Sequence, residues 1–512
     1  MARRSLLTRS GAILFGAPLG FLIAFVILAG GWTLVVFKDI SRELLGTSLG
    51  TYIMGPVPIL RRLDDLLVAV CIVGIYAAGL LLAYNMSVLI NWLFARYGKR
   101  SAPYDDLLPY RPSESRSKAN LLKNFHKIGI VLAGGGAKGA FQAGALKAVY
   151  EFLAENDALD KVKVISATSI GSWNTMFWLA DLIVSADNGK LSVHEYWWKS
   201  ISLRSLLAPS WYVPGYRNAF CVTSPWRRTF DAIFTQPAVK EHIAKSKIHF
   251  YLTRSNVKSG LLECTTNNPN AKSTVKTRYH RASHSKPAGD FPTLVVTNKD
   301  ADKLLQDIKA GVFASMDLPP LFPYERIQND QFEDGGVIDN LPIQFAAMER
   351  CDLTFVLPLN SDFVADVNER SIFHRLFRVL DIRQGALERN SLKIQYLYNE
   401  LAVLRDRVTT LEAKMSDAKV DVPPVGNSKI LREALGRTHQ QSRVFGICPD
   451  RRLVESTINT WELWKSKEAD AAFSLMYRAA KTALSSGFDP SEERTIIALV
   501  HPAGNVDYFV DF

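Results

Sequence analysis

Short apolar runs and longer runs with helical periodicity alternate through the middle of the chain. Residues 128–132 and 162–165 are apolar runs of strand length, and helical patterns follow them over 141–153 and from about 171. A third buried-looking run covers 353–357. This order predicts an α/β fold in which parallel strands end at one common edge of a sheet.

Weaker patterns surround this centre. Candidate strands, rich in β-branched and aromatic residues, fall at 248–253, 260–265, 275–279, 293–297, 444–448 and 495–500. A further helix is predicted over 461–484, and the segment 421–512 is expected to add to the same domain.

The segment 361–420 is strongly helical and contains a heptad pattern over 387–415. Its apolar residues alternate at spacings of three and four, with polar Asn390 at one position: Leu387, Ile394, Leu397, Leu401, Leu404, Val408, Leu411 and Met415. Two interpretations are equally open. The helix forms a coiled coil, by which the chain self-associates or docks on a partner, or it packs on the core of its own domain.

The first 95 residues contain two long apolar stretches, 11–37 and 66–94. Each is long enough to span a bilayer, so we predict a two-helix transmembrane hairpin. A cleaved signal peptide is the alternative, because arginines precede the first stretch, but that stretch exceeds a usual signal core. More basic residues flank the two ends of the hairpin than lie in its connecting loop. Because basic flanks usually stay in the cytoplasm, the catalytic domain is predicted to face the cytoplasm.

Composition narrows the classes of function. The formal net charge is +11, which together with the apolar stretches favours anionic lipid over nucleic acid as a partner. The five cysteines are scattered without a C-x-x-C pair, so neither a disulfide framework nor a metal site is indicated, and no cofactor is expected. Scattered cysteines also fit a reducing compartment.

Between the hairpin and the α/β region, residues 96–124 are rich in Pro, Ser and mixed charge, as in a linker. A catalytic domain is expected over 125–360. Within it, residues 205–234 are dense in aromatic and basic side chains. These either pack beneath a long loop, which is slightly favoured, or form an interfacial lid on the membrane.

Candidate chemistry begins with the glycine loop after the first strand, where Gly134, Gly135, Gly136, Lys138 and Gly139 stand. The spacing matches the dinucleotide fingerprint, but no carboxylate closes the second strand to hold a ribose. A phosphate-binding P-loop also fails, because no Gly-Lys-Ser/Thr follows at the required distance. Glycines that merely make a tight turn are the remaining alternative.

A serine follows the second strand in the sequence Ala167-Thr168-Ser169-Ile170-Gly171. This is one methyl group away from the G-x-S-x-G elbow, which presents a nucleophilic serine on a sharp strand-to-helix turn. Much later, Asp334-Gly335-Gly336 forms what is in isolation an ordinary turn signal.

Together these motifs, and the lead-in at 314–323, resemble the patatin-like phospholipase family over residues 127–357. The resemblance implies a three-layer fold with a mainly parallel sheet, and a Ser–Asp dyad of Ser169 as nucleophile and Asp334 as its base. It also implies an oxyanion hole from the N–H groups of Gly134, Gly135 and Gly136. Lys138, Gly139, Gly171, Gly335 and Gly336 are supporting motif residues.

The resulting hypothesis is a membrane-anchored serine acyl hydrolase that cleaves phospholipid or other acyl-ester lipids. A transacylase differs only in using another alcohol as the acyl acceptor. The alternative from another class is a catalytically silent, membrane-anchored scaffold that uses the glycine loop to bind lipid headgroups and the heptads to assemble.

Overall fold

The computed structural model describes most of the chain after residue 103. The described ranges are 104–112, 121–187, 189–209, 219, 221–271, 294–295, 300–319, 321–327, 329–360, 372–417, 441–458, 466–492 and 494–510. The two predicted membrane stretches, 11–37 and 66–94, lie outside them. Within the described residues, no helix has both the length and the apolar character needed to cross a bilayer.

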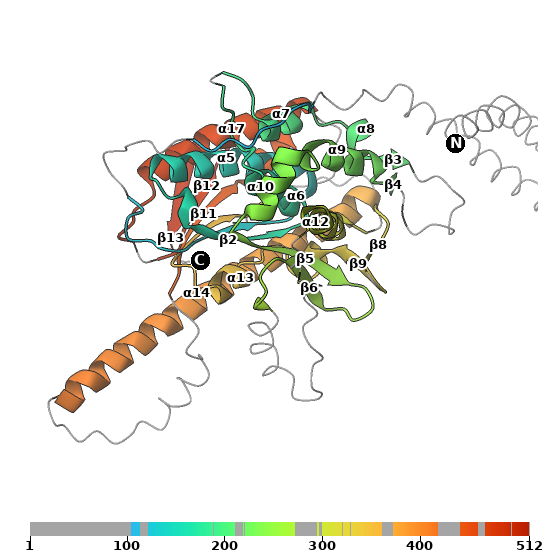
Figure 1. The fold of residues 1–512 in the computed structure, drawn as a ribbon. Helices are drawn as coiled ribbons and strands as arrows, with labels where there is room; N and C mark the ends of the chain where they lie inside the picture. The colour runs from blue at the N-terminus through green and yellow to red at the C-terminus, as the bar shows by residue number, and fades with distance from the viewer. Residues whose placement is uncertain are drawn as a thin grey trace, which may run out of the picture. The chain divides into compact units, whose positions relative to one another are not determined.

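One large sheet forms the centre of the main unit, which comprises residues 101–206, 226–319 and 324–512 (Figure 1). Its strands lie in the order β13-β12-β11-β10-β1-β2-β5-β6-β7, and β9 pairs with both β5 and β8. The strands are β1 (Ile128–Leu132), β2 (Val162–Thr168), β5 (His249–Asn256), β6 (Leu262–Thr266), β7 (Leu294–Val295), β8 (Glu325–Ile327), β9 (Asp330–Asp334), β10 (Leu353–Leu357), β11 (Arg443–Pro449), β12 (Ile496–Val500) and β13 (Val506–Val510).

The middle of this sheet is parallel. Strand β1 pairs in parallel with β10 on one side and β2 on the other, with Ile130 opposite Phe355 and Ile165. The pairs β2–β5, β10–β11 and β11–β12 are also parallel, whereas β6, β9 and β13 pair antiparallel with their neighbours β5, β5 and β12. Every residue of β1 and β10 is buried, as expected for strands covered on both faces.

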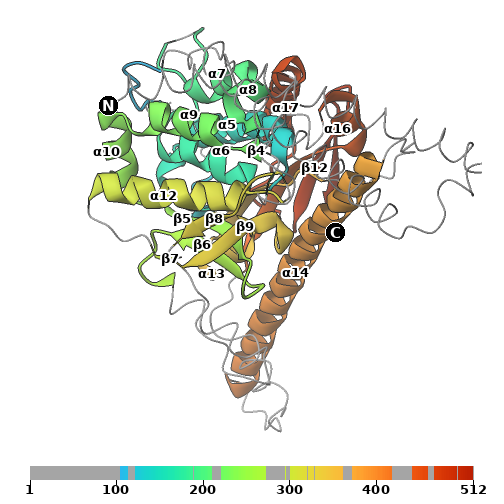
Figure 2. The same cartoon turned by 90° about the vertical axis from the view of Figure 1, so that its right-hand side faces the viewer.

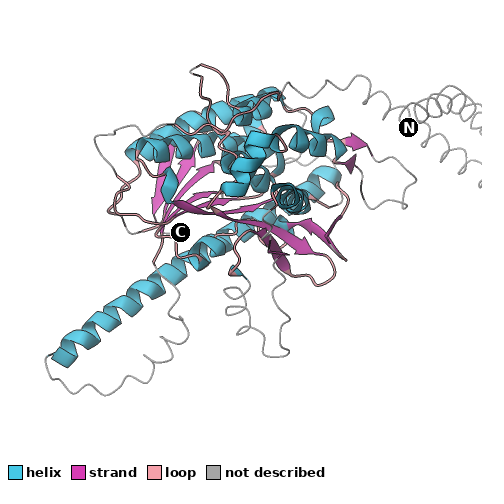
Figure 3. Ribbon diagram, in the orientation of Figure 1, coloured by secondary structure: helices cyan, strands magenta, loops and turns pink. Residues whose placement is uncertain are grey.

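Helices cover both faces of the sheet (Figure 3). In Figure 1, α5, α6, α7 and α17 lie above it, and α13 and α14 lie below. The helices are η2 (Gly136–Lys138), α5 (Gly139–Glu155), η3 (Leu159–Lys161), α6 (Ile170–Leu179), α7 (Val193–Ser200), α8 (Leu203–Leu206), α9 (Ser224–Phe234), α10 (Pro237–Lys245), α12 (Ala301–Met316), η4 (Gly335–Val337), α13 (Gln344–Met348), α14 (Ile372–Asp417), α16 (Arg451–Thr457) and α17 (Ser466–Ser486).

The second unit comprises residues 1–100, 207–225 and 320–323, of which the structure describes only a small part. It contains a two-stranded antiparallel sheet of β3 (Ala208–Pro209) and β4 (Cys221–Val222), in which Ala208 is opposite Val222. The N–H of Cys221 donates to the carbonyl oxygen of Leu321 at 2.9 Å.

The predicted elements outside the centre are found with shifted ends. The strands expected at 248–253 and 260–265 are β5 and β6, and the helix expected at 461–484 is α17. The strand expected at 275–279 lies outside the described residues. Helix α14 runs for 46 residues from beneath the sheet and extends well beyond it (Figure 2).

Candidate active site

Ser169 sits on a strained turn between β2 and α6. Its backbone has φ 54° and ψ −124°, a left-handed conformation that is unfavourable for a residue with a side chain. The backbone N–H of Ser169 donates to the hydroxyl of Ser315 at 2.9 Å. The turn leads directly into α6, where a Cβ on Gly171 would approach the carbonyl oxygen of Leu132 to 2.7 Å, so only glycine allows the helix to start this close to β1.

Ala167, which stands where the elbow pattern has its first glycine, is an ordinary strand residue. It is fully buried in β2, opposite Leu132 and Leu252, and its φ is not positive. Its conformation therefore does not require glycine. The departure from the G-x-S-x-G pattern leaves the serine turn intact.

Asp334 ends β9 and caps the short helix η4, which contains Gly335 and Gly336. Its Oδ1 accepts from the N–H of Gly336 at 2.7 Å, and its own N–H donates to the carbonyl oxygen of Asp317 at 3.0 Å. Strand β9 pairs with β5, and β5 pairs with β2, so the sheet itself carries Asp334 toward the serine turn.

The structure brings Ser169 and Asp334 together although 165 positions separate them (334 − 169). The Ser169 side chain lies beside the Asp334 carboxyl group and lowers its pKa as a hydrogen-bond donor. Burial raises the pKa of Asp334 to about 7, against the lowering effects of the bonds from Ser169 and the Gly336 amide. Asp334 is 1% exposed, which accounts for so large a desolvation effect.

The glycine loop lies next to the serine, but its three amides are not equivalent. The N–H of Gly134 donates to the carbonyl oxygen of Asn340 at 3.1 Å, so this amide is already engaged. Among the described residues, no acceptor is bonded to the N–H groups of Gly135 and Gly136, which precede and begin η2. The amides open to a ligand are therefore those of Gly135 and Gly136.

Gly134 has a steric role instead. A Cβ at this position would lie 2.9 Å from the Cβ of Ser169 and 2.5 Å from Oδ1 of Asn340. Contacts below 3.0 Å are too short for carbon atoms. The absence of a side chain at Gly134 is thus what lets the loop approach the serine turn.

Lys138 and Gly139 hold the end of the loop. Lys138 is 3% exposed, and its Nζ donates to Oδ1 of Asn360 and pairs with Asp381 at 3.5 Å. Gly139 begins α5, where a Cβ would lie 2.8 Å from the ring of Trp198. Lys138 therefore fixes the loop and does not face solvent, where a lipid phosphate would be.

Three further residues support the site, and the sequence analysis assigned a role to none of them. Ser315 accepts from the serine turn, and Asn340 bonds both polar backbone groups of Gly134, with its Nδ2 3.0 Å from the Gly134 carbonyl oxygen. Glu388, fully buried on α14, accepts from Nδ2 of Asn340 at 2.5 Å. Ser315 lies in the lead-in stretch 314–323, whereas Glu388 lies in the helix read only as a heptad pattern.

The aromatic segment 205–234 is buried where the structure describes its second half. The ring of Trp226 lies 5.4 Å from that of Trp173, and Phe230 lies 6.2 Å from Trp173. Arg227 pairs with Glu325 instead of reaching outward. Packing, the favoured interpretation, therefore holds for Trp226 and Phe230. The other aromatic residues on which the lid interpretation depends, at 210–218 and 220, lie outside the described part.

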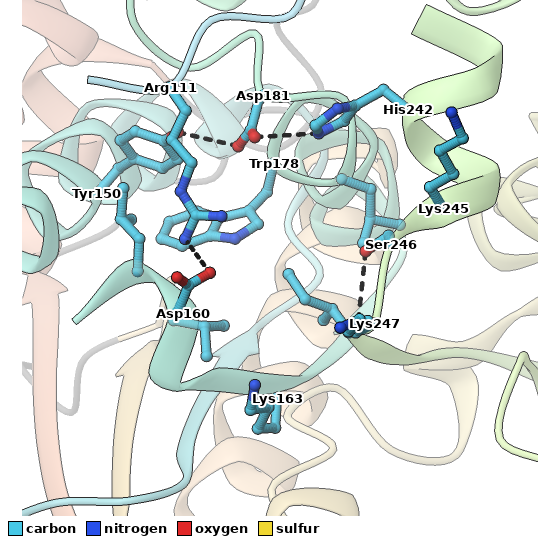
Figure 4. A pocket seen from close by; sticks show the side chains of 14 residues that line it. Arg111, Tyr150, Asp160, Lys163, Trp178, Asp181, His242, Lys245, Ser246 and Lys247 are labelled. Atoms are coloured by element: carbon cyan, nitrogen blue, oxygen red, sulfur yellow. Dashed lines mark hydrogen bonds and ion pairs between the residues drawn. The ribbon is translucent and has the colours of Figure 1, made fainter. Parts of the chain in front are cut away.

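Figure 4 shows a pocket of about 270 Å³. Its lining includes Val162 at the start of β2 and Leu179 at the end of α6, whereas Ser169 lies at the other end of both elements. In it, Asp181 accepts from the hydroxyl of Tyr150 at 2.9 Å and pairs with His242 at 3.0 Å. None of the predicted site residues lines it. In the part of the chain that the structure describes, no group of three or more His, Cys, Asp and Glu side chains could hold a metal ion.

On this α/β fold, a serine on a strained strand-to-helix turn thus lies beside a buried aspartate and the amides of a glycine loop. Residues 130–347 match the family model described as patatin-like phospholipase. The chain therefore carries a patatin-like phospholipase domain over this range.

The solved structure of VipD from Legionella pneumophila is similar to this chain with a TM-score of 0.29 and 13% sequence identity, covering 77% of this chain and 73% of VipD. No curated protein sequence matches the chain.

Proposed function

We propose that the protein is a serine acyl hydrolase that cleaves carboxylic esters of lipids, with Ser169 as nucleophile and Asp334 as its base. The observation that supports this most directly is the position of the Ser169 side chain beside the buried Asp334 carboxyl group, to which it can donate a hydrogen bond. Ester substrates need such an activated hydroxyl, and the patatin-like domain supports a lipid as the acyl donor.

The reaction follows from these groups. The Ser169 oxygen attacks the ester carbonyl carbon while its proton moves to Asp334. The carbonyl oxygen becomes an oxyanion, which the free N–H groups of Gly135 and Gly136 stabilise. Asp334 returns the proton to the leaving alcohol as the ester bond breaks. Water then hydrolyses the acyl-enzyme by the same path, and a second alcohol in its place would give a transacylase.

The raised pKa of Asp334 makes it a better base than an ordinary carboxylate. A carboxylate with a pKa near 4 holds a serine proton poorly, whereas one near 7 is matched to neutral pH. Burial thus gives the aspartate a basicity near neutral pH, which a histidine provides in a Ser-His-Asp triad. The aspartate must be ionised to act, so activity requires a pH above its pKa.

A fluorophosphonate probe tests the proposal, because it labels only an activated serine. We expect the wild-type protein to be labelled and to hydrolyse p-nitrophenyl esters. Ser169→Ala should lose both properties while keeping its melting temperature. Ser200→Ala, in α7, is the matched control and should behave as wild type. Labelling that persists in Ser169→Ala would place the nucleophile elsewhere.

The same experiment decides between the hydrolase and the silent scaffold. A scaffold would bind lipid vesicles without reacting with the probe. Two observations favour the hydrolase: Ala167 does not disturb the turn, and Lys138 is buried away from any headgroup. A folded wild-type protein that neither reacts with the probe nor hydrolyses esters would support the scaffold.

We further propose that the stretches 11–37 and 66–94 anchor the domain in a membrane as a hairpin, with the domain in the cytoplasm. Their length, lack of charge and flanking basic residues support this. Deleting residues 1–95 should release the protein from membranes in a carbonate wash. If the deleted form still sediments with membranes, a further integral attachment exists.

Self-association through the distal part of α14 is the last element of the proposal. Leu397, Leu404 and Leu411 share one heptad position and are 56%, 47% and 58% exposed, so this face does not pack on the core of its own domain. In a parallel in-register pair of helices, Glu400 of one copy would face Arg405 of the other, five positions on, as coiled coils prefer.

Sedimentation of the full chain in detergent tests this pairing. Leu404→Glu should give monomers, and Thr409→Glu, also on an exposed part of the helix, is the control. Glu400→Arg should weaken the dimer, and adding Arg405→Glu should restore it. A wild-type chain that is monomeric at all concentrations would refute the dimer.

A further inference from the structure

Glu388 is a buried carboxylate whose hydrogen-bonding capacity is completely used. Its Oε1 accepts from Nδ2 of Asn340 and Nδ2 of Asn360, each at 2.5 Å. Its Oε2 accepts from the backbone N–H groups of Leu359 at 3.1 Å and Asn360 at 3.0 Å. A carboxylate has about four lone-pair positions, so four donors fill it.

Each of these donors is connected to the glycine loop. Asn340 donates to the carbonyl oxygen of Gly134 at 3.0 Å. Leu359 packs against Gly135, where a Cβ would meet its side chain at 2.6 Å. Asn360 accepts from Lys138 through its Oδ1. Glu388 therefore lies behind the loop and reaches its beginning, middle and end through one intermediate residue each.

The bonding pattern requires the ionised form of Glu388. A proton on either oxygen would displace one of the four donors, because none of them can accept it. The charges around the carboxyl group are few. Lys138 from the glycine loop is the nearby cation, and Asp381 on α14 pairs with it. The hydrogen-bond partners of Glu388, which are Asn340, Leu359 and Asn360, are neutral.

We propose that Glu388 is a positioning residue: its carboxylate on α14 clamps the glycine loop so that the amides of Gly135 and Gly136 stay next to Ser169. This rests on the proposed function of the site. It also connects α14, which continues beyond Glu388 for about eight further turns, to the glycine loop. The helix thereby supports the site at one end while its exposed half is free to meet another chain.

Protonation should release the clamp. Burial raises the pKa of Glu388 to about 7, and Lys138 together with the Asn360 bonds opposes the rise. Below this pH the neutral acid loses at least one donor. Two ionisations, those of Asp334 and Glu388, would then control the rate in the same pH range.

The experiment compares three variants of the full chain. Glu388→Gln places an NH₂ group against N–H donors and should lower kcat by about a hundredfold with KM little changed, because the loop is misplaced only slightly. Glu388→Asp keeps the charge and should recover part of the rate. Glu241→Gln, at an exposed glutamate of α10, is the control and should match wild type.

The pH profile separates positioning from a merely structural role. On the acid side, wild type should lose activity as two protons bind, and Glu388→Gln as one proton binds, because only Asp334 still titrates. A Glu388→Gln protein with wild-type kcat and an unchanged acid limb would overturn the proposal. The proposal would also be overturned if the loss of rate in Glu388→Gln were no larger than the loss of folded protein.

Amide hydrogen exchange keeps this test independent of the esterase assignment. In Glu388→Gln, the amides of residues 134–138 should exchange faster than in wild type, whereas those of β1 should not. If wild type proves inactive but this difference appears, the clamp stands and the proposed function fails. If wild type is active and exchange is unchanged, the function stands and the clamp fails.

Discussion

The backbone N–H of Ser169 is bonded to the hydroxyl of Ser315, which lies 146 positions later in the chain at the end of α12. The same hydroxyl accepts from Oγ of Ser172, one turn into α6, at 2.8 Å. One side chain from a distant helix thus holds both the strained turn and the start of the helix that follows it. The strain at Ser169 is maintained by its surroundings.

Ser315→Ala should therefore affect activity and stability together. The N–H of Ser169 would be left buried without a partner, which costs about 1–3 kcal/mol in free energy of unfolding. We expect kcat on an ester substrate to fall by about tenfold as the turn relaxes, because even a small misplacement of the nucleophile slows the reaction. Chemical denaturation and steady-state kinetics measure the two effects.

Ser172→Ala is the matched comparison for Ser315. It removes the other bond to the Ser315 hydroxyl and leaves the bond from Ser169 in place. Its kcat should remain near wild type. Equal losses of rate in both variants would show that the hydroxyl does not act through the Ser169 amide.

Asp334→Asn should abolish hydrolysis and yet stabilise the protein at alkaline pH. The amide can still accept from Gly336, but it cannot take a proton from Ser169. The pKa of Asp334 is raised from 3.8 to about 7. Between these values the folded protein holds a proton that the unfolded chain has released, so the free energy of unfolding falls as pH rises through this window.

The stability difference has a defined pH dependence. Above pH 7 the wild type bears the full cost of the buried charge, on the order of 1–4 kcal/mol, and the variant bears none. Below pH 4 the two should converge. Urea denaturation of both proteins at pH 4, 6 and 8 measures this. A constant difference across the three would mean that Asp334 does not titrate in the folded state.

The rate should follow the ionisation of the same group. Because Asp334 acts as a base, kcat should rise with pH through about 7 and level off above it. His194, fully buried with its pKa lowered to about 3 by burial, and by Lys147, should not contribute. A pH–rate profile in buffers of constant ionic strength tests this. A rate that is already maximal at pH 5 would contradict an aspartate with so high a pKa.

The sequence was informative where a motif is local. The strands 128–132 and 162–165, the glycine loop and the serine turn are contiguous patterns, and the turn chemistry at Asp334 is also local. The order of motifs indicated that Ser169 and Asp334 belong to one site, and the structure brings them together. Their catalytic roles remain a prediction.

Other features depend on the three-dimensional arrangement and left no pattern. Nothing local shows that the Gly134 amide is bonded to Asn340, which lies 206 positions later in the chain. Nor does any local pattern show that Glu388 is buried, because its burial follows from the course of α14 beneath the sheet. A glutamate in a heptad-like helix looks like a surface residue. Periodicity also cannot show where along α14 the side chains change from buried to exposed. Glu388 is buried, whereas Leu404 and Leu411 are exposed.

The close approach of Gly134 to Ser169 gives the sharpest test of the loop. In Gly134→Ala the new methyl group would lie 2.9 Å from the Cβ of Ser169 and 2.5 Å from Oδ1 of Asn340, so the loop or the turn must move. A displacement of this size misaligns the amides of Gly135 and Gly136 with the developing oxyanion. We expect a loss of kcat of at least about a hundredfold.

Gly385→Ala provides the control for this substitution. Gly385 lies in α14, where an added Cβ meets its nearest neighbours at 3.5 Å, an ordinary contact. That change should leave kcat unaltered and stabilise the helix by up to about 1 kcal/mol. Circular dichroism should show both variants folded. If Gly134→Ala hydrolysed esters as fast as Gly385→Ala, the loop would have no part in stabilising the oxyanion, and its glycines would serve only the turn.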